Sequence, residues 1–179
     1  DDGYQHVQLH RDVNLLLVDA TDATGIQAAL PVGRLREPLS AAARASAILM
    51  TRVDQEHDGE LVWRRLVEAC DSLPSLVRVG FRAEEFRRVG TDERRPLDAF
   101  RGRSALLFSG IGNAESFRTL VAGLGLTVGE LLAFPDHVHY TRGVMDTIRA
   151  KAKSCGVDLL VTTEKDADKV APLLAADEV

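Results

Sequence analysis

The stretch ALLFSGIGNAESFRTLVAGL, residues 105–124, contains the pattern that decides the fold. A short apolar run is followed by a glycine-containing turn at 110–112, and then by apolar residues at helical spacing. A buried strand that turns directly into a helix is the repeating unit of an α/β protein. We therefore expect a strand at 105–109 and a helix at 114–124.

The same alternation continues on both sides of this stretch, with apolar runs typical of buried strands separated by segments of helical spacing. Strands that alternate with helices predict an α/β fold with a mainly parallel sheet flanked by helices. The other expected strands are 12–19, 47–51, 76–81, 131–134 and 157–162, and the other expected helices are 41–44, 60–70, 141–154 and one that starts at 164.

Composition limits the classes of protein to which this chain can belong. Its 179 residues, 45% of them hydrophobic, suffice for one globular domain of ordinary size or for one and a half small ones. No stretch approaches the roughly 18 consecutive apolar residues of a membrane span. Cys70 and Cys155 lack the spacing of a structural zinc site or a disulfide framework. The net charge of -5 argues against a nucleic-acid partner.

Arginines gather in one segment, 76–104, where we expect an irregular or two-stranded excursion. One interpretation is a solvated face in which these arginines pair with the glutamates and aspartates of the same segment. The other is a surface for an anionic partner, such as lipid headgroups. The sequence leaves both interpretations open.

The chain opens with DDGYQH, residues 1–6. Carboxylates such as those of Asp1 and Asp2 at the end of a strand can hold Mg²⁺, a hard cation that takes oxygen ligands. Alternatively, the pair is a helix N-cap or part of a turn. A motif this dense at the first residue predicts that these residues are a piece of a longer protein.

The loop LPVGRLREP, residues 30–38, combines stiffness with charge. Its two prolines restrict the backbone, while Gly33 lets it turn. Arg34 and Arg36 supply guanidinium groups suited to phosphate oxygens, and Glu37 supplies an acceptor. The loop is therefore either a nucleotide or phosphate edge, or a proline-bounded loop with solvated charges.

The third stretch is FPDHVHY, residues 134–140, which directly follows an apolar strand. Asp136 and His137 lie adjacent at the strand exit, where open α/β sheets place their sites. His139 points the same way as His137 if strand geometry continues through this stretch. A histidine here is able to take a proton from a nucleophile or to bind a metal ion, and the sequence leaves both roles open.

Taken together, these stretches resemble one protein family in their content and order. The resemblance is to the tetraacyldisaccharide 4'-kinases, the lipid A 4'-kinases of Gram-negative bacteria, and it covers nearly the whole chain. The matching motifs, besides the three stretches above, are HRD at 10–12, a strand that ends in Asp19, SGIGNAESF at 109–117 and TTEKDADK at 162–169.

The resemblance implies an enzyme that uses ATP and Mg²⁺ to phosphorylate the 4'-hydroxyl of a tetra-acylated glucosamine disaccharide, the lipid A precursor. It implies a P-loop fold, and for the complete enzyme peripheral association with the cytoplasmic face of the bacterial inner membrane. Residues 1–75 are then the remainder of the P-loop kinase core, 76–104 an Arg-rich excursion or linker, and 105–179 a C-terminal α/β portion.

The resemblance also assigns roles to individual residues. His137 matches the histidine that works with an upstream aspartate to activate the sugar hydroxyl, and its neighbour Asp136 orients it. Asp1 and Asp2 match an acidic pair that lies near Mg²⁺ in the family. Arg36 and Glu37 match a loop that lies beside the nucleotide, ATP.

The chain departs from the family pattern in two respects. Arg34 stands where the family commonly has proline, and the sequence contains no GxxxxGK[ST] motif to cradle the phosphates. We therefore expect the 179 residues alone to be inactive as a kinase.

Two other classes of function stay open, which are a metal-dependent phosphoesterase and a non-catalytic nucleotide-binding or lipid-binding module. The phosphoesterase would draw on the Asp and His side chains of 1–10 and 136–139.

Overall fold

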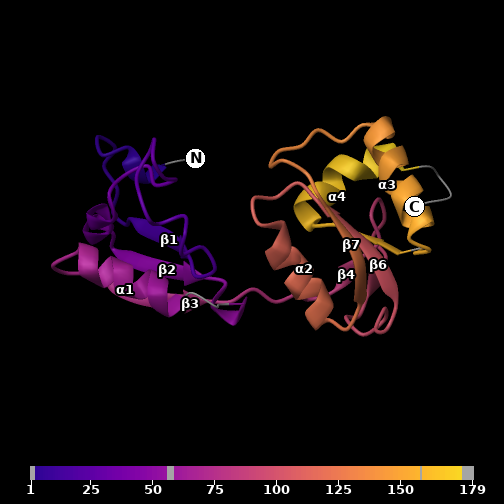
Figure 1. Ribbon diagram of the computed structural model, residues 1–179, viewed down its shortest axis with the longest axis horizontal. Helices are drawn as coiled ribbons and strands as arrows, with labels where there is room; N and C mark the ends of the chain where they lie inside the picture. Colours follow the sequence, from indigo (N-terminus) through magenta and orange to yellow (C-terminus); the bar gives the residue numbers. More distant parts are fainter. Residues whose placement is uncertain (1–2, 56–58, 158, 175–179) are drawn as a thin grey trace. The chain divides into compact units, whose positions relative to one another are not determined.

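The computed structural model describes residues 3–55, 59–157 and 159–174. The chain forms two compact units, Asp1–Phe81 and Arg82–Val179. Each unit contains a three-stranded sheet in which every pair of neighbouring strands is parallel, with helices packed against it (Figure 1). The expected α/β fold class with mainly parallel sheets is confirmed.

The first unit builds its sheet in chain order, β1-β2-β3. The bounds of β2 agree with the sequence expectation, because its apolar run is closed by polar residues on both sides. The elements are η1 (Gly3–Gln5), β1 (Leu15–Asp19), η2 (Leu39–Arg44), β2 (Ala47–Thr51), η3 (Val53–Gln55), α1 (Gly59–Ala69) and β3 (Ser75–Val79).

Helix α1 covers one face of this sheet. Its apolar residues recur at helical spacing, so that Val62 and Leu66 share one side of the helix and are buried. They pack against Ile48 and Met50, which alternate with outward-facing residues along β2. The core of the first unit therefore lies between α1 and the even-numbered positions of the strands.

The opposite face of the same sheet is apolar and exposed. Leu17, Leu49 and Val77 lie in register across the three strands. Leu17 is 66% exposed and Val77 is 46% exposed, so this row is poorly covered. A contiguous apolar row on a sheet face favours association between molecules.

We expect the purified 179-residue chain to self-associate through this row, and Leu17→Lys to reduce the associated fraction severalfold at equal concentration. Sedimentation velocity measures that fraction. Leu61→Lys is the matched control, because Leu61 is also an exposed leucine but lies on α1. Equal association of the wild type and the Leu17 variant would show that the row is not the contact surface.

The second unit has its first long strand at the centre of the sheet, in the order β7-β6-β8. A short antiparallel hairpin, β4-β5, precedes this sheet in the sequence. The elements are β4 (Phe86–Arg87), β5 (Arg94–Arg95), β6 (Ser104–Ser109), α2 (Ala114–Gly123), β7 (Thr127–Ala133), α3 (Arg142–Ser154), β8 (Leu159–Val161), α4 (Glu164–Val170) and η4 (Ala171–Leu173).

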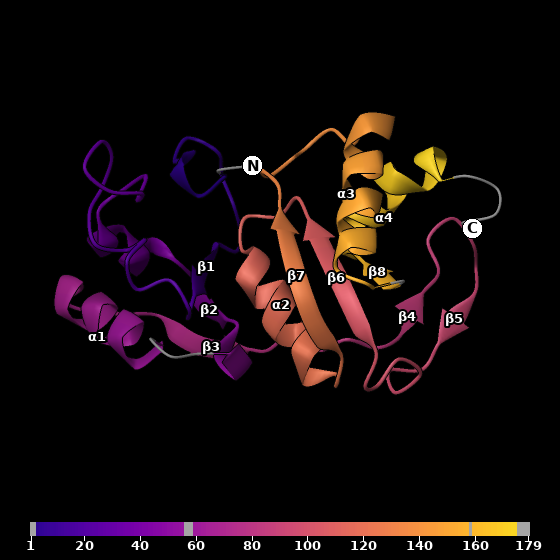
Figure 2. The ribbon, with the colours of Figure 1, turned by 45° about the vertical axis from the view of Figure 1, so that its right-hand side comes forward.

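Strand β6 is buried on both faces, as its continuous apolar run predicts. Leu106 and Phe108 pack in one cluster with residues of α3, whereas Leu107 packs in another with Val121 of α2. Figure 2 shows these two helices on opposite sides of the sheet. The central strand β6 thus provides the packing surface for the helices on both sides of the sheet.

Two elements of the second unit differ from the sequence expectation by more than one residue at an end. Strand β7 begins at Thr127, earlier than expected, because it is an edge strand whose half-exposed positions accept polar residues such as Glu130. Strand β8 is shorter than expected and consists of Leu159–Val161. Among the described residues, no helix combines the length and apolar character needed to cross a membrane.

The arginine-rich segment contributes β3 to the first unit and the β4-β5 hairpin to the second. Around the hairpin, Arg94 pairs with Glu85 at 2.9 Å and Arg88 pairs with Glu93 at 3.4 Å. Two hydrogen bonds hold the pKa of Glu93 below its ordinary value. The one from Arg95 has the larger effect on this pKa, and the one from Arg88 has the smaller. Several of these arginines therefore have acidic partners within the same segment.

Candidate functional site

The candidate site lies where the three parallel strands of the second unit end. Parallel strands present their carboxyl ends at one edge of a sheet, which is where open α/β sheets bind ligands. Strand β6 exits into the turn at 110–113, β7 exits into the loop that carries Asp136 and His137, and β8 exits toward α4. Motifs far apart in the sequence are therefore brought to one edge.

Asp166 anchors this edge from within the protein. Its side chain is fully buried, and one carboxylate oxygen accepts hydrogen bonds from the backbone N–H of Gly110 at 2.7 Å and from the hydroxyl of Thr163 at 3.0 Å. The other oxygen accepts from Lys169 Nζ at 3.1 Å. Because Thr163 is also the N-cap of α4, Asp166 ties the start of this helix to the end of β6.

The ionisation of Asp166 follows from these contacts. Burial acts to raise the pKa of the carboxyl group, since a charge is less stable away from water. The hydrogen bonds from Gly110, Lys169 and Thr163 together outweigh burial and hold the pKa below its ordinary value. Asp166 is therefore a buried carboxylate whose charge is compensated by its partners.

The turn after β6 packs closely against the loop after β7. A Cβ atom on Gly110 would clash with a methyl group of Val138, so no larger residue fits at this position while Val138 stays in place. Glycine is thus required at 110 by the approach of the neighbouring loop. This contact keeps the segment that carries Asp136 and His137 against the central strand.

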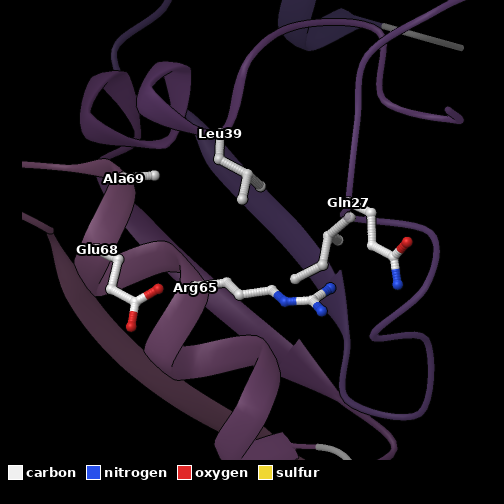
Figure 3. Close-up of a pocket in the computed structure, with 6 residues that line it drawn as sticks. Gln27, Leu39, Arg65, Glu68 and Ala69 are labelled. Carbon is white, nitrogen blue, oxygen red and sulfur yellow. The ribbon is translucent and has the colours of Figure 1, made fainter. Parts of the chain in front are cut away.

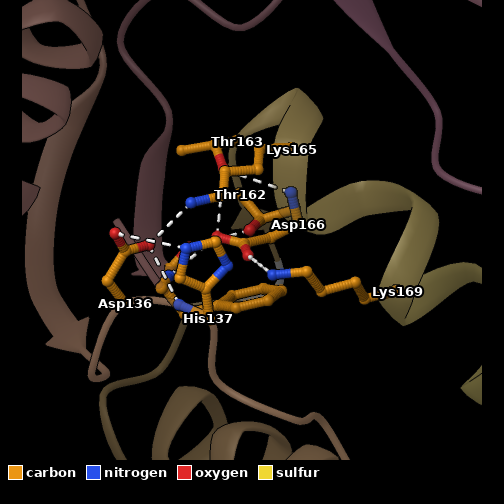
Figure 4. Close-up of polar contacts among 9 residues, drawn as sticks. Asp136, His137, Thr162, Thr163, Lys165, Asp166 and Lys169 are labelled. Atoms are coloured by element: carbon orange, nitrogen blue, oxygen red, sulfur yellow. Dashed lines mark hydrogen bonds and ion pairs between the residues drawn. The ribbon is translucent and has the colours of Figure 1, made fainter. Parts of the chain in front are cut away.

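Asp136 is the centre of the polar contacts on the exposed side of this edge. Its Oδ1 atom accepts a hydrogen bond from Lys165 Nζ at 2.6 Å and another from the backbone N–H of His137 at 2.9 Å. Its Oδ2 atom lies 3.9 Å from His137 Nε2. Figure 4 shows Lys165 and His137 approaching the same carboxylate. The hydrogen bond from Lys165 is the largest influence that holds the pKa of Asp136 below its ordinary value.

His137 presents its imidazole to solvent. Its side chain is 81% exposed, and its backbone has a φ of 60°, in the left-handed region that non-glycine residues seldom occupy. Residues held in such conformations cluster at functional sites. The exposed ring and constrained backbone suit a group that must meet a substrate in one orientation.

The expected alignment of His139 with His137 was conditional, and its condition is not met. It required the strand to continue, but β7 ends at Ala133 and a turn follows, in which Val138 donates a backbone hydrogen bond to Pro135 at 3.1 Å. Proline at this position favours such a stop, because it lacks the N–H that a strand ladder needs. Of the two histidines, only His137 makes a polar contact with Asp136 within the described part of the chain.

The second candidate segment, residues 28–38, lies in the first unit. Backbone hydrogen bonds between Ala28 and Leu35 and between Leu30 and Leu35 close it into a compact loop. Arg34 of this loop pairs with Asp22 at 2.8 Å, so this arginine is tied to the preceding turn. Arg36 is exposed.

Glu37 has a partner of its own. Both of its carboxylate oxygens accept hydrogen bonds from Arg44, at 2.7 and 3.0 Å. This bidentate pair holds the pKa of Glu37 below its ordinary value. The Arg44 guanidinium also lies 4.9 Å from the ring centroid of Tyr4, whose hydroxyl donates to Ala41 O at 2.7 Å. Glu37 therefore helps to hold the residues after DDG against η2.

A further polar cluster at the carboxyl edge of the first sheet was missed by the sequence analysis. Asp19, the last residue of β1, accepts hydrogen bonds from the hydroxyl and backbone N–H of Thr21 at 2.7 and 3.0 Å and pairs with Arg52. Arg52 follows β2 with a φ of 58°. The pairing of neighbouring parallel strands, which sequence spacing alone does not give, brings these two residues together.

The two residues predicted to hold the metal ion, Asp1 and Asp2, lie outside the described residues. Within the described ranges, no group of three or more His, Cys, Asp or Glu side chains is arranged to hold a metal ion. The histidines proposed for a dinuclear centre are divided between the units, with His6 and His10 in the first and His137 and His139 in the second.

The first unit also contains a hollow of about 400 Å³ beside α1. Figure 3 shows Arg65 reaching across it, and the guanidinium of Arg65 donates to the backbone carbonyl of Ala23. The hollow is lined by Ile26, Gln27, Leu39, Arg65, Glu68 and Ala69. No residue predicted from the sequence to bind a ligand is among them.

Comparison with known proteins identifies the family. A family model described as tetraacyldisaccharide-1-P 4'-kinase matches residues 1–179. The chain belongs to this family. A tetraacyldisaccharide 4'-kinase of Geobacter metallireducens is 33% identical over 98% of this chain and 49% of its own length. One of Anaeromyxobacter dehalogenans is 35% identical over 98% of this chain and 47% of its own length.

A crystal structure of LpxK from Aquifex aeolicus in complex with ATP is also similar to this chain. The two are 29% identical with a TM-score of 0.54, over 95% of this chain and 47% of that structure. The chain therefore spans about half the length of the tetraacyldisaccharide 4'-kinases it matches. The family resemblance expected from the sequence is confirmed.

Some residues of the second unit that contact the candidate site were not predicted from the sequence, and they belong to a motif that matches the family. TTEKDADK, residues 162–169, was noticed in the sequence only as a matching motif. The structure shows that Thr163, Asp166 and Lys169 of this motif fix the sheet edge, while Lys165 contacts Asp136. Two lysines and three acids within the eight residues that follow a strand were the available signal.

Proposed function

We propose that this chain serves in the transfer of the terminal phosphoryl group of ATP to the 4'-hydroxyl of a tetra-acylated glucosamine disaccharide, the lipid A precursor. The observation that carries the proposal is the family match over all 179 residues. The exposed Asp136–His137 pair at a strand exit supports it, because that is where α/β enzymes place reacting groups.

His137 takes the proton of the sugar hydroxyl in this proposal. Histidine is the side chain most often used as a general base, because its imidazole can accept a proton as a hydroxyl attacks. Asp136 faces the ring and stabilises the imidazolium that forms. Since phosphoryl transfer depends on positioning and charge neutralisation, a correctly placed base is one of the few chemical groups that the protein must supply.

ATP and Mg²⁺ have candidate partners in the chain. Arg36 offers an exposed guanidinium suited to phosphate oxygens. Asp1 and Asp2 offer an all-oxygen donor set of the kind that Mg²⁺ prefers, and Glu37 sits beside Arg36 with its carboxylate oriented by Arg44. Bound Mg²⁺ supplies neutralisation of the phosphate charge.

The proposed substrate carries acyl chains, and this sets the proposed location. We infer that the complete enzyme associates peripherally with the cytoplasmic face of the inner membrane of a Gram-negative bacterium. There the acyl chains stay in the bilayer while the sugar hydroxyl and ATP meet at the surface.

A transfer assay with the complete kinase, expressed at the full length of its relatives, tests the proposed function. Radiolabelled ATP and the lipid disaccharide should give a labelled 4'-phosphate product. The 179 residues alone should give none above a no-enzyme blank, because their sequence has no GxxxxGK[ST] phosphate cradle.

Two outcomes would overturn the proposal. One is release of phosphate from the 4'-phosphorylated lipid by the complete protein, with no transfer from ATP. The other is binding of ATP and lipid without any turnover, which would make the protein a binding module.

A further inference from the structure

We propose that Lys165 is a positioning residue for the kinase reaction, which fixes the Asp136 carboxylate so that Asp136 in turn holds His137 in its reactive orientation. The proposal rests on the proposed function, in which His137 takes the proton of the sugar hydroxyl. It goes beyond that function by assigning a role to a lysine of α4, an element that carries none of the residues to which the family resemblance gave a role.

The first observation is that Asp136 is the polar partner of His137. Within the described residues, His137 makes its polar contacts with Asp136, one through the backbone N–H and one through the ring. Because the His137 side chain is largely exposed, packing does little to hold it. The orientation of the imidazole therefore depends on where the Asp136 carboxylate lies.

The second observation is that Lys165 fixes this carboxylate. Its Nζ atom lies 2.6 Å from Asp136 Oδ1, the same atom that accepts from the His137 N–H. The Asp136 carboxylate accepts the N–H of the next residue but can still rotate about its side-chain torsions. A short charge-assisted hydrogen bond from a lysine restricts that rotation. With Oδ1 held by two donors, Oδ2 is left facing the imidazole.

The third observation is that Lys165 extends from a firmly held backbone. It is the second residue of α4, directly between the Glu164 that begins the helix and the buried Asp166. Asp166 is bonded to Gly110 at the end of the central strand, so the first turn of α4 is fixed to the sheet. The link from the core to His137 thus runs through Asp166, the α4 backbone, Lys165 and Asp136.

The exposure of the Lys165–Asp136 pair argues for positioning over stabilisation. The side chains are 43% and 46% exposed, and ion pairs this exposed contribute little to the free energy of unfolding. Loss of Lys165 should therefore leave the fold intact and release Asp136. The matching pair Lys151–Glu130, at 3.0 Å with a lysine of equal exposure, lies on α3 and β7 away from the strand exits.

The test compares Lys165→Met and Lys151→Met in the complete kinase. We expect Lys165→Met to lower kcat about 10-fold to 100-fold, the range for a displaced reacting group, with little change in the KM for ATP. Lys151→Met should leave both unchanged. Lys165→Arg, which can still donate to Asp136, should recover most of the lost kcat, whereas the same loss in the arginine variant would contradict the proposal.

A double-mutant cycle asks whether Lys165 acts through Asp136. In an Asp136→Asn background, Lys165→Met should cause little further loss of kcat, because the group it positions has already been changed. Losses that multiply would show that Lys165 acts independently. A higher KM for ATP at unchanged kcat would show that Lys165 contacts the nucleotide, and would overturn the positioning role.

The NMR signal of the His137 ring provides a readout that does not depend on activity. In protein labelled on histidine, Lys165→Met should shift or broaden the His137 ring resonance, while Lys151→Met should not. If the complete protein lacks kinase activity, the proposed function fails, and this signal still decides whether Lys165 orders His137. An unchanged His137 resonance in the Lys165 variant would refute the positioning proposal.

Discussion

Replacing His137 with asparagine in the complete kinase is expected to lower kcat by a factor of about 10² to 10⁴, the usual contribution of a positioned general base. Asparagine is the suitable replacement because it tolerates the left-handed backbone found here, with its φ of 60°. The variant should therefore keep the loop conformation while it loses the proton acceptor. Initial rates of transfer from radiolabelled ATP to the lipid measure the effect.

The control for this experiment is His139→Asn. His139 is also exposed and lies two residues along the same loop, so it controls for the introduction of asparagine near the site. Its kcat should match that of the wild type. If the His137 variant stays within about tenfold of the wild-type kcat, His137 is not the general base and the proposed mechanism is wrong.

Replacing Asp166 with alanine is expected to destabilise the second unit by about 1–3 kcal/mol, the cost of leaving a buried hydrogen-bonding group without its partner. The substitution leaves the N–H of Gly110 without its acceptor and Lys169 without its partner. Urea unfolding monitored by tyrosine circular dichroism measures the stability. Hydrogen exchange should show that the Gly110 amide loses protection.

Asp168→Asn is the matched control, since Asp168 lies on the same helix but is exposed. Its effect on the free energy of unfolding should be within about 0.5 kcal/mol, as for most surface substitutions. Equal stability of the two variants would contradict the anchoring role of Asp166.

The pH dependence of the Asp166 effect follows from the direction of its pKa shift. The folded-state pKa is lowered, so the stability that this carboxylate contributes is fully present above the pKa of an unfolded aspartate, about 3.9. It is lost as the pH falls through the lower folded-state pKa. The wild type and the alanine variant should therefore approach each other in stability only in strongly acidic solution.

Local patterns were sufficient to predict much of the fold. The apolar run of β2 and the start of α2 were located to the residue, because polar or glycine-containing segments bound each of them. The ends of β7 were not, because an edge strand tolerates polar residues at its start and because the turn at Pro135 stops it. Periodicity describes buried surfaces better than half-exposed ones.

The candidate site was predictable only in part. Asp136 and His137 were recognised because they are adjacent in the sequence and follow an apolar strand. Lys165 lies 29 residues from Asp136, and Asp166 lies 56 residues from Gly110, so only the order of the strands brings them together. The roles of Asp136, His137, Arg36, Glu37, Asp1 and Asp2 stay predictions.

The close packing of Gly110 against Val138 has a consequence for how this family is able to diverge. Any side chain at 110 requires space that Val138 occupies, so a larger residue at 110 needs Val138 to shift or to be replaced by a smaller residue. The two positions lie in different motifs, yet they share a single volume. A larger residue at 110 is therefore expected to occur together with a change at 138. Relatives that carry alanine at 110 should carry a residue smaller than valine at 138.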